Sequence, residues 1–159
     1  MSEIVKRQVA GASLHTVWKK NRLRETSKFA CVVRGLPGCG KTTFVLDHFK
    51  GKKVFYFSFA GLEETFAERL FVERVMAETE VAVSTWAGAI KTVTTEFSVI
   101  LLDDIDSIST YKRFQKAFYD HAYGTRTFVV LIARPMDDVS GLADKYNEVR
   151  LDCFPFMKQ

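Results

Sequence analysis

The stretch RGLPGCGKTT, residues 34–43, decides how this sequence folds. Gly35 and Gly40 bracket a loop whose backbone must approach an anion closely and take conformations that a side chain would obstruct. The N–H groups of residues 38–43 are expected to point inward at the start of a helix, where the helix dipole also favours an anion. Lys41 adds a cation, and the hydroxyl of Thr42 is placed for Mg²⁺. The stretch therefore predicts a phosphate-binding loop.

Apolar runs and amphipathic segments alternate on both sides of this loop. Strands are expected at residues 29–33, 53–59, 97–102, 127–133 and 148–153, and helices at residues 42–49, 62–76, 84–95, 111–121 and 139–146. Short apolar runs rich in branched residues favour buried parallel strands, and apolar residues at three-and-four spacing favour helices. Five strands separated by helices predict an α/β fold, a three-layer sandwich around a mainly parallel five-stranded sheet.

The helix expected at residues 62–76 has a distinct apolar pattern. Glutamates and arginines separate its apolar residues, which indicates an amphipathic helix with one face in the core. The residues expected on that face are Leu62, Phe66, Leu70, Phe71, Val75 and Met76.

The composition limits the class of protein. The 159 residues, 47% of them hydrophobic, fit one globular domain with a real core. Neither a membrane-spanning apolar run nor a signal-peptide pattern occurs, which predicts a soluble, cytoplasmic protein with no membrane partner. The three cysteines (Cys31, Cys39 and Cys153) form no zinc-type pair and are expected to be reduced.

The positive charge is concentrated at the N-terminus. The net charge is +4, whereas residues 1–30 alone contain seven Lys and Arg and two Glu. We therefore expect a basic N-terminal arm or helix at residues 1–26, followed by the core at residues 27–159. Such a basic segment contacts the phosphates of DNA or RNA in some proteins, and in at least as many it is a solvated helix face. Both interpretations stay open.

A second group of candidate site residues lies in ILLDDID, residues 100–106. An apolar strand that ends at Asp103 and Asp104 delivers two carboxylates to the edge where open α/β sheets bind ligands. Asp103 is expected to hold Mg²⁺ through water, and Asp104 to orient or deprotonate a water molecule near a γ-phosphate. Without the upstream loop, the same pair of aspartates would often be a simple turn.

GLPGCGKTT followed by ILLDDID resembles the Walker A and Walker B motifs of P-loop ATPases, in the branch (ASCE) that contains the AAA+ and STAND families. The resemblance implies a sheet in strand order 5-1-4-3-2, with the strand at residues 127–133 inserted between the two strands that bear the motifs. It implies a polar γ-phosphate sensor at the tip of that inserted strand, where Arg134 stands, so that Lys41, Asp104 and Arg134 are the expected catalytic residues. Thr42 and Asp103 are the expected metal ligands. The residues expected to contact the nucleotide are Gly35, Leu36, Pro37, Gly38, Cys39, Gly40, Lys41, Thr42 and Thr43.

The layout of ILLDDIDSI followed by ARPMDDVSGLADKY is also similar to that of bacterial replication initiators and helicase loaders, which are AAA+ proteins. A small helical lid follows the core in the AAA+ branch. The sequence ends just past the fifth expected strand, so we expect the nucleotide-binding core without that lid.

The expected function is Mg²⁺-dependent hydrolysis of ATP, coupled to an unidentified protein partner. Most ATPases of this branch have glutamate where Asp104 stands, and the shorter aspartate predicts slow, switch-like hydrolysis. The alternatives are a small-molecule or polynucleotide kinase, with Asp47 as the acceptor base, a viral-type helicase fragment, and a scaffold that binds ATP without hydrolysing it. The choice between ATP and GTP stays open.

Overall fold

The computed structural model describes residues 2–23, 30–122, 125–143 and 146–151. The strands are β1 (Ala30–Arg34), β2 (Val54–Ser58), β3 (Val99–Asp103), β4 (Phe128–Ala133) and β5 (Tyr146–Arg150). The helices are α1 (Glu3–Arg22), α2 (Lys41–His48), α3 (Glu64–Thr79), α4 (Trp86–Glu96) and α5 (Lys112–Ala122), with a 3-10 helix η1 at Ile105–Thr110.

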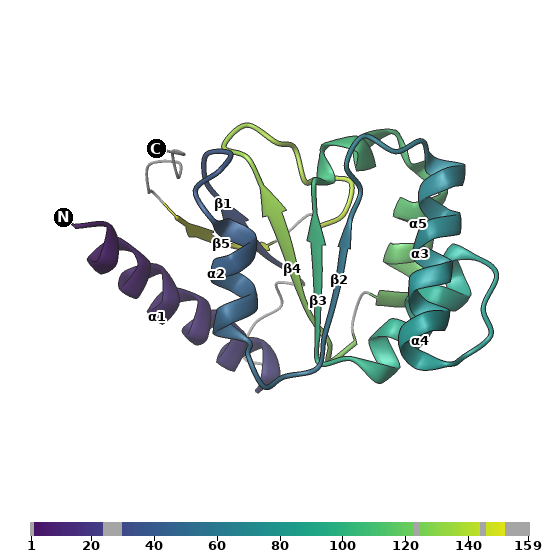
Figure 1. Ribbon diagram of the computed structural model, residues 1–159, viewed down its shortest axis with the longest axis horizontal. Helices are drawn as coiled ribbons and strands as arrows, with labels where there is room; N and C mark the ends of the chain where they lie inside the picture. Colours follow the sequence, from purple (N-terminus) through teal and green to yellow (C-terminus); the bar gives the residue numbers. More distant parts are fainter. Residues whose placement is uncertain (1, 24–29, 123–124, 144–145, 152–159) are drawn as a thin grey trace.

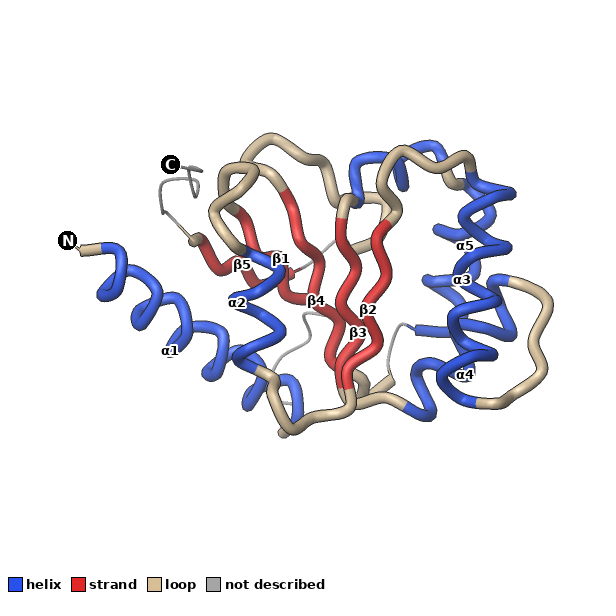
Figure 2. The backbone as a smooth tube through the Cα atoms, viewed as in Figure 1, coloured by secondary structure: helices blue, strands red, loops and turns tan. Residues whose placement is uncertain are grey.

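The five strands form one parallel sheet in the order β2-β3-β4-β1-β5. Strand β4 lies between β1 and β3, so it separates the strand that leads into the glycine-rich loop from the strand that ends in the acidic pair. The predicted α/β sandwich and the predicted strand order are confirmed. Helices α1 and α2 cover one face of the sheet, and α3, α4 and α5 cover the other (Figures 1 and 2).

Each face of the sheet has its own hydrophobic core. Alternate residues of β1 point to opposite faces, as in any strand. Val32 packs with the side chains of α3, α4 and α5, and Cys31 and Val33 pack with those of α1 and α2. Because helices cover both faces, β1 and β4 are buried at every position, which explains why β4 and the first four residues of β1 are apolar.

Helix α1 packs against the sheet. Its residues Ala10 and Leu14 are 3% and 0% exposed and lie in the same core as Cys31 and Val33. Whether residues 1–26 form a separate unit stays a prediction. None of the described helices combines the length and the apolar character that a membrane span requires.

The helix expected at residues 139–146 is absent from the described part of that segment. Val139, Leu142 and Ala143 are buried at helical spacing, which accounts for the wrong prediction. The chain makes only one turn there, in which the N–H groups of Leu142 and Ala143 donate to the carbonyl of Val139, and the carboxylate of Asp138 accepts from Ser140 N at 2.9 Å. The last strand begins at Tyr146 rather than at residue 148, and its described part ends at Arg150. Residues 29, 152 and 153 lie outside the described residues.

The buried face of α3 differs from the predicted one. Phe71 and Val75 are buried as predicted, together with Ala67 and Val72. Phe66 and Met76, which were expected in the core, are 48% and 37% exposed. The buried stripe repeats at every fourth residue from Ala67, and this places Phe66 and Met76 beside it.

Candidate nucleotide site

The glycine-rich loop joins the end of β1 to the start of α2. Gly38 and Gly40 have φ angles of 79° and 82°, in the left-handed region that favours glycine. Gly40 is the N-cap of α2 and provides no side chain, so the loop leaves the first N–H groups of the helix for an anion. The backbone of Gly35 has no such angle. Its glycine is required because a Cβ atom there would lie 2.8 Å from both Cys39 Sγ and Leu151 O.

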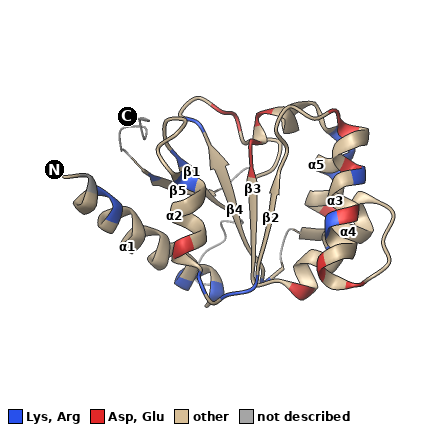
Figure 3. Ribbon diagram, in the orientation of Figure 1, with Lys and Arg blue, Asp and Glu red and all other residues tan. Residues whose placement is uncertain are grey.

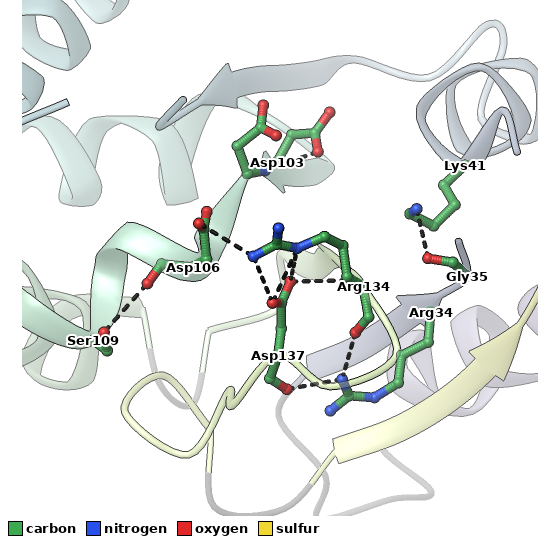
Figure 4. A network of polar contacts seen from close by, with 9 residues as sticks. Arg34, Gly35, Lys41, Asp103, Asp106, Ser109, Arg134 and Asp137 are labelled. Atoms are coloured by element: carbon green, nitrogen blue, oxygen red, sulfur yellow. Dashed lines mark hydrogen bonds and ion pairs between the residues drawn. The ribbon is translucent and has the colours of Figure 1, made fainter. Parts of the chain in front are cut away.

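Lys41 is the first residue of α2 and is 8% exposed. Its Nζ atom donates to Gly35 O at 2.8 Å and to Leu36 O at 2.9 Å, so the ammonium group lies along the loop (Figure 4). Helix α1 also contacts the loop, because Arg7 Nη2 donates to Cys39 O at 2.8 Å. This contact was not predicted, since nothing in the sequence relates Arg7 to a residue 32 positions away.

A cavity of about 530 Å³ lies beside the loop, at the carboxyl end of the strands. Six of the nine loop residues predicted to contact the nucleotide line it: Pro37, Gly38, Gly40, Lys41, Thr42 and Thr43. The other three do not. Gly35 and Cys39 pack beneath the loop, and Leu36 is half-exposed outside the cavity.

The acidic pair at the end of β3 meets this loop. Asp103 Oδ2 accepts a hydrogen bond from Thr42 Oγ1 at 2.6 Å, although the two residues are 61 positions apart. The same oxygen accepts from Tyr56 OH at 2.9 Å, and Asp103 Oδ1 accepts from Asp104 N at 2.8 Å. The two predicted metal ligands therefore lie in direct contact. A hydroxyl and a carboxylate are the oxygen donors that Mg²⁺ prefers, so this pair fits the ion.

Asp104 has a φ angle of 52°, and among the described residues only Glu80 shares the left-handed region without being glycine. A non-glycine residue in this region costs roughly 1–3 kcal/mol, and such residues cluster at functional sites. The carboxylate of Asp104 lines the cavity and accepts a hydrogen bond from the hydroxyl of Ser58.

Sequence reasoning missed Tyr56 and Ser58. Both lie on β2, where they alternate with the buried Phe55 and Phe57, and Ser58 pairs in register with Asp103. Burial and the hydrogen bond to Asp103 raise the pKa of Tyr56, so its hydroxyl remains a donor at neutral pH. The available signal was the alternation of Tyr56 and Ser58 with phenylalanines in FYFSF, residues 55–59.

Arg134 follows the end of β4 and lines the same cavity. Its guanidinium donates to Asp137 Oδ1 from Nε at 3.2 Å and from Nη2 at 3.1 Å, and Nη2 lies 3.2 Å from Asp106 Oδ2 (Figure 4). The hydrogen bond to Asp137 and the charges of Asp137 and Asp106 raise the pKa of Arg134. The structure thus brings Arg134 to the cavity together with Lys41 and Asp104. Asp106 and Asp137 were not predicted as part of this site.

This sheet order, with a glycine-rich loop between β1 and α2 and an acidic pair after β3, defines the nucleotide-binding core of a P-loop triphosphatase. Residues 31–143 match the family described as "ATPase family associated with various cellular activities (AAA)", and the chain belongs to that family. Binding and hydrolysis of ATP are thereby supported at a general level. The search among curated proteins found no match.

Three solved structures share the fold. The Aeropyrum pernix ORC1 protein in complex with DNA is 18% identical, with a TM-score of 0.60 over 90% of this chain and 44% of that one. The Walker-type ATPase paby2304 of Pyrococcus abyssi is 9% identical, with a TM-score of 0.57 over 93% and 53%. The Drosophila ORC bound to DNA is 17% identical, with a TM-score of 0.51 over 91% and 47%. This chain spans about half the length of these chains.

Proposed function

We propose that this chain binds ATP together with Mg²⁺ and hydrolyses it slowly, as a switch whose nucleotide state a partner reads. The observation that carries the proposal is the 2.6 Å hydrogen bond between Thr42 Oγ1 and Asp103 Oδ2. It joins the glycine-rich loop to the acidic strand end at the wall of one cavity. A structural glycine loop would have no need of a carboxylate beside its threonine.

The residues at the cavity have separate roles in the proposed reaction. The N–H groups of the loop and Lys41 bind the phosphates, and Thr42 and Asp103 would hold Mg²⁺. When bound, that ion would neutralise charge on the phosphate oxygens. The cavity of about 530 Å³ lies within the range of small-ligand sites in proteins, roughly 300–1,000 Å³.

Asp104 is the proposed general base. In this step one of its carboxylate oxygens accepts a proton from the attacking water, whose oxygen forms a bond to the γ-phosphorus. The bond from the γ-phosphorus to the bridging oxygen breaks, and ADP leaves with the electron pair. The hydrogen bond from Ser58 holds the carboxylate of Asp104 toward β2. The short side chain and this restraint together support slow hydrolysis.

The geometry gives less support to a kinase. Asp47, the acceptor base that a kinase would need, is the seventh residue of α2 and is exposed. At 1.5 Å per residue, it lies about 9 Å along the helix axis from the loop that holds the phosphates.

Asp104→Asn separates hydrolysis from binding. We expect this variant to bind an ATP analogue as the wild type does and to release no phosphate. Asp138→Asn removes the same charge outside this cavity and should keep both properties. If the protein is a scaffold, the wild type will release no phosphate from ATP. If it is a kinase, it will consume ATP only when an acceptor for the phosphoryl group is added. Absence of ATP binding at millimolar nucleotide with Mg²⁺ would refute the proposal.

The second part of the proposal concerns nucleic acid as the partner. Exposed cations gather at the end of the sheet opposite the cavity, from the last turn of α1 and the turn before β2 (Figure 3). They are Lys19, Lys20, Arg22, Lys50, Lys52 and Lys53. Trp18 joins the two segments, with Arg22 Cζ 4.7 Å and Lys52 Nζ 5.0 Å from its ring centroid. Two of the structures with this fold are complexes with DNA, which also favours this partner.

Charge reversal tests this basic surface. We expect Lys20→Glu combined with Lys52→Glu to weaken binding of single- or double-stranded DNA or RNA and to reduce its dependence on salt. Lys91→Glu, on the exposed side of α4, is the matched control. Binding that is unchanged in the double variant would refute this part of the proposal without touching the ATPase.

A further inference from the structure

The guanidinium of Arg134 is held between two carboxylates from different segments. Asp137 follows β4 in the same turn, and Asp106 belongs to η1. The bonds to Asp137 use Nε and Nη2, and the ion pair with Asp106 uses Nη2. In the described part of the chain, Nη1 has no hydrogen bond, although Arg134 lines the cavity. Nη1 is therefore available to a ligand, whereas the two carboxylates share Nη2.

Asp137 is fixed in place by the turn that carries it. Asp137 N donates to Arg134 O at 3.2 Å, and Asp137 Oδ2 accepts from Arg134 N at 2.8 Å, so backbone and side chain close the same four-residue turn. Pro135 is at the second position of the turn, where its fixed φ angle is favourable. The side chain of Asp137 is only 11% exposed, whereas that of Asp106 is 50% exposed.

Arg34 anchors this turn to the sheet. It is the last residue of β1, and its side chain is 9% exposed. Its Nη1 atom donates to Arg134 O at 3.0 Å and to Asp137 O at 2.8 Å (Figure 4). Its Nε atom lies 3.6 Å from Glu148 Oε2. The strand that leads into the glycine-rich loop therefore also holds the turn that orients Arg134.

We infer that Asp137 is the positioning residue of Arg134 and that Asp106 competes with the terminal phosphate of ATP for Arg134 Nη2. This inference rests on the proposed function. Asp137 fixes a long side chain before the nucleotide arrives, which lowers the entropy that binding must remove. Asp106 is the more exposed and the more weakly attached of the two carboxylates, so it is the one that a phosphate oxygen displaces.

The two carboxylates should affect nucleotide selectivity in opposite directions. Only ATP has the γ-phosphate, so the readout is the ratio of the dissociation constant of ADP to that of ATP. Asp137→Asn should lower this ratio, because Arg134 loses its orienting charge. Asp106→Asn should raise the ratio, because the competing carboxylate is neutralised. Arg134→Ala should lower it at least as far as Asp137→Asn does.

The experiment measures displacement of a fluorescent ADP analogue by ATP and by ADP, with Mg²⁺ present throughout. Water screens exposed charge pairs, so each ratio is expected to change by only about two- to fivefold. The asparagine at position 137 keeps the size of the side chain and an oxygen that accepts from Arg134 N. Asp138→Asn is the matched control, since its carboxylate accepts from Ser140 N rather than from Arg134.

The outcomes distinguish this inference from the proposed function. If the wild type binds neither nucleotide, the proposed function fails. If it binds both, opposite shifts for Asp137→Asn and Asp106→Asn support the inference. Equal losses of ATP and ADP affinity in Asp137→Asn would indicate a merely structural role and overturn it. Shifts of both variants in the same direction, or an unchanged ratio in Arg134→Ala, would overturn it as well.

Discussion

Replacing Tyr56 by phenylalanine removes one hydroxyl from the surroundings of Asp103 and leaves the ring in place. Asp103 Oδ2 now accepts two hydrogen bonds, at 2.6 Å from Thr42 and at 2.9 Å from Tyr56. In the variant only Thr42 remains on that oxygen, and Thr42 is also a proposed ligand of Mg²⁺. The variant therefore lacks the hydroxyl of Tyr56, which donates to the carboxylate of Asp103 and is not itself a proposed metal ligand. We expect weaker binding of Mg²⁺ with ATP and a small loss of stability.

The size of both effects follows from the geometry. A hydrogen bond to a charged group contributes about 1.5–3 kcal/mol, and because Tyr56 is only half-buried, water replaces part of it and about 1 kcal/mol is expected in the free energy of unfolding. For a domain of this size, that corresponds to a fall in Tm of about 2–4 °C. Groups that orient a metal-binding carboxylate contribute about 10- to 100-fold to metal affinity, and a partly exposed donor belongs at the lower end, near tenfold.

The assay titrates Mg²⁺ against a fixed concentration of a fluorescent ATP analogue and reports the half-saturating Mg²⁺ concentration. Burial and the hydrogen bond to Asp103 raise the pKa of Tyr56 above its ordinary value of about 10. Below about pH 10 the hydroxyl of Tyr56 is therefore fully protonated, and its stabilising hydrogen bond is fully present. This stabilisation is lost only as the pH rises through the higher pKa of the folded state. The difference between wild type and variant should accordingly be constant from about pH 6 to pH 9.

Tyr119→Phe, at an exposed position on α5, is the matched control and should leave the half-saturating Mg²⁺ concentration unchanged. A Tyr56→Phe variant whose half-saturating concentration stays within twofold of the wild type would refute the role assigned to this hydroxyl. A fall in Tm without any change in Mg²⁺ dependence would refute it too.

Three further substitutions or conditions test other parts of the site. Gly35→Ala places a Cβ atom 2.8 Å from Leu151 O and Cys39 Sγ, so chemical denaturation should show a loss of about 1–3 kcal/mol in the free energy of unfolding. An unchanged denaturation midpoint would mean that the loop shifts to accommodate the Cβ atom without a cost in stability. Asp104→Glu extends the proposed base by one methylene and should accelerate phosphate release by about tenfold, because an error of about 1 Å in the position of a base costs up to about a hundredfold in rate. A slower variant would contradict the proposal that the short side chain of Asp104 limits the rate. Burial, and then the charge of the neighbouring His15, lower the pKa of His48, so its neutral form stabilises the packing of α1 and α2 above about pH 6.5 and that stability is lost as the pH falls. Tm should therefore fall between pH 7.5 and pH 5.5, and less so in His48→Asn; equal slopes would refute the role of His48.

The sequence was informative wherever one short segment determines the structure. The runs FSVILL and TFVVLIA have unbroken apolar stretches at residues 99–102 and 128–133, without the alternating polar residues of a half-exposed strand. Both were therefore identified as buried strands within two residues of their observed ends. The glycine-rich loop and the acidic pair were found because their residue types are required by phosphate and metal chemistry. The strand order followed from the resemblance to known ATPases, since local patterns do not determine which strands are neighbours.

The residues that were missed depend on contacts between distant segments. Arg34 reads as the polar end of a strand, and only the fold brings it to the carbonyl of Asp137, 103 positions away. Ser58 reads as an ordinary strand residue until β2 is placed beside β3. The wrong helix at residues 139–146 has the same cause, because its apolar spacing reports burial against neighbouring elements rather than helical hydrogen bonding.

The charges at the cavity suggest why such a site depends on a divalent cation. Among the described residues that line it, Lys41 and Arg134 are the cations and Asp103, Asp104, Asp106 and Asp137 are the anions, so the carboxylates outnumber the cations by two. Lys41 donates to two loop carbonyls, and Arg134 is paired with two carboxylates. A free triphosphate would therefore meet a site whose side chains repel it on balance, with only the N–H groups of the loop and of the start of α2 in its favour. On the proposed function, a divalent ion held between Thr42 and Asp103 would cancel that excess of two negative charges, so the site would receive the metal complex of the nucleotide rather than the nucleotide alone.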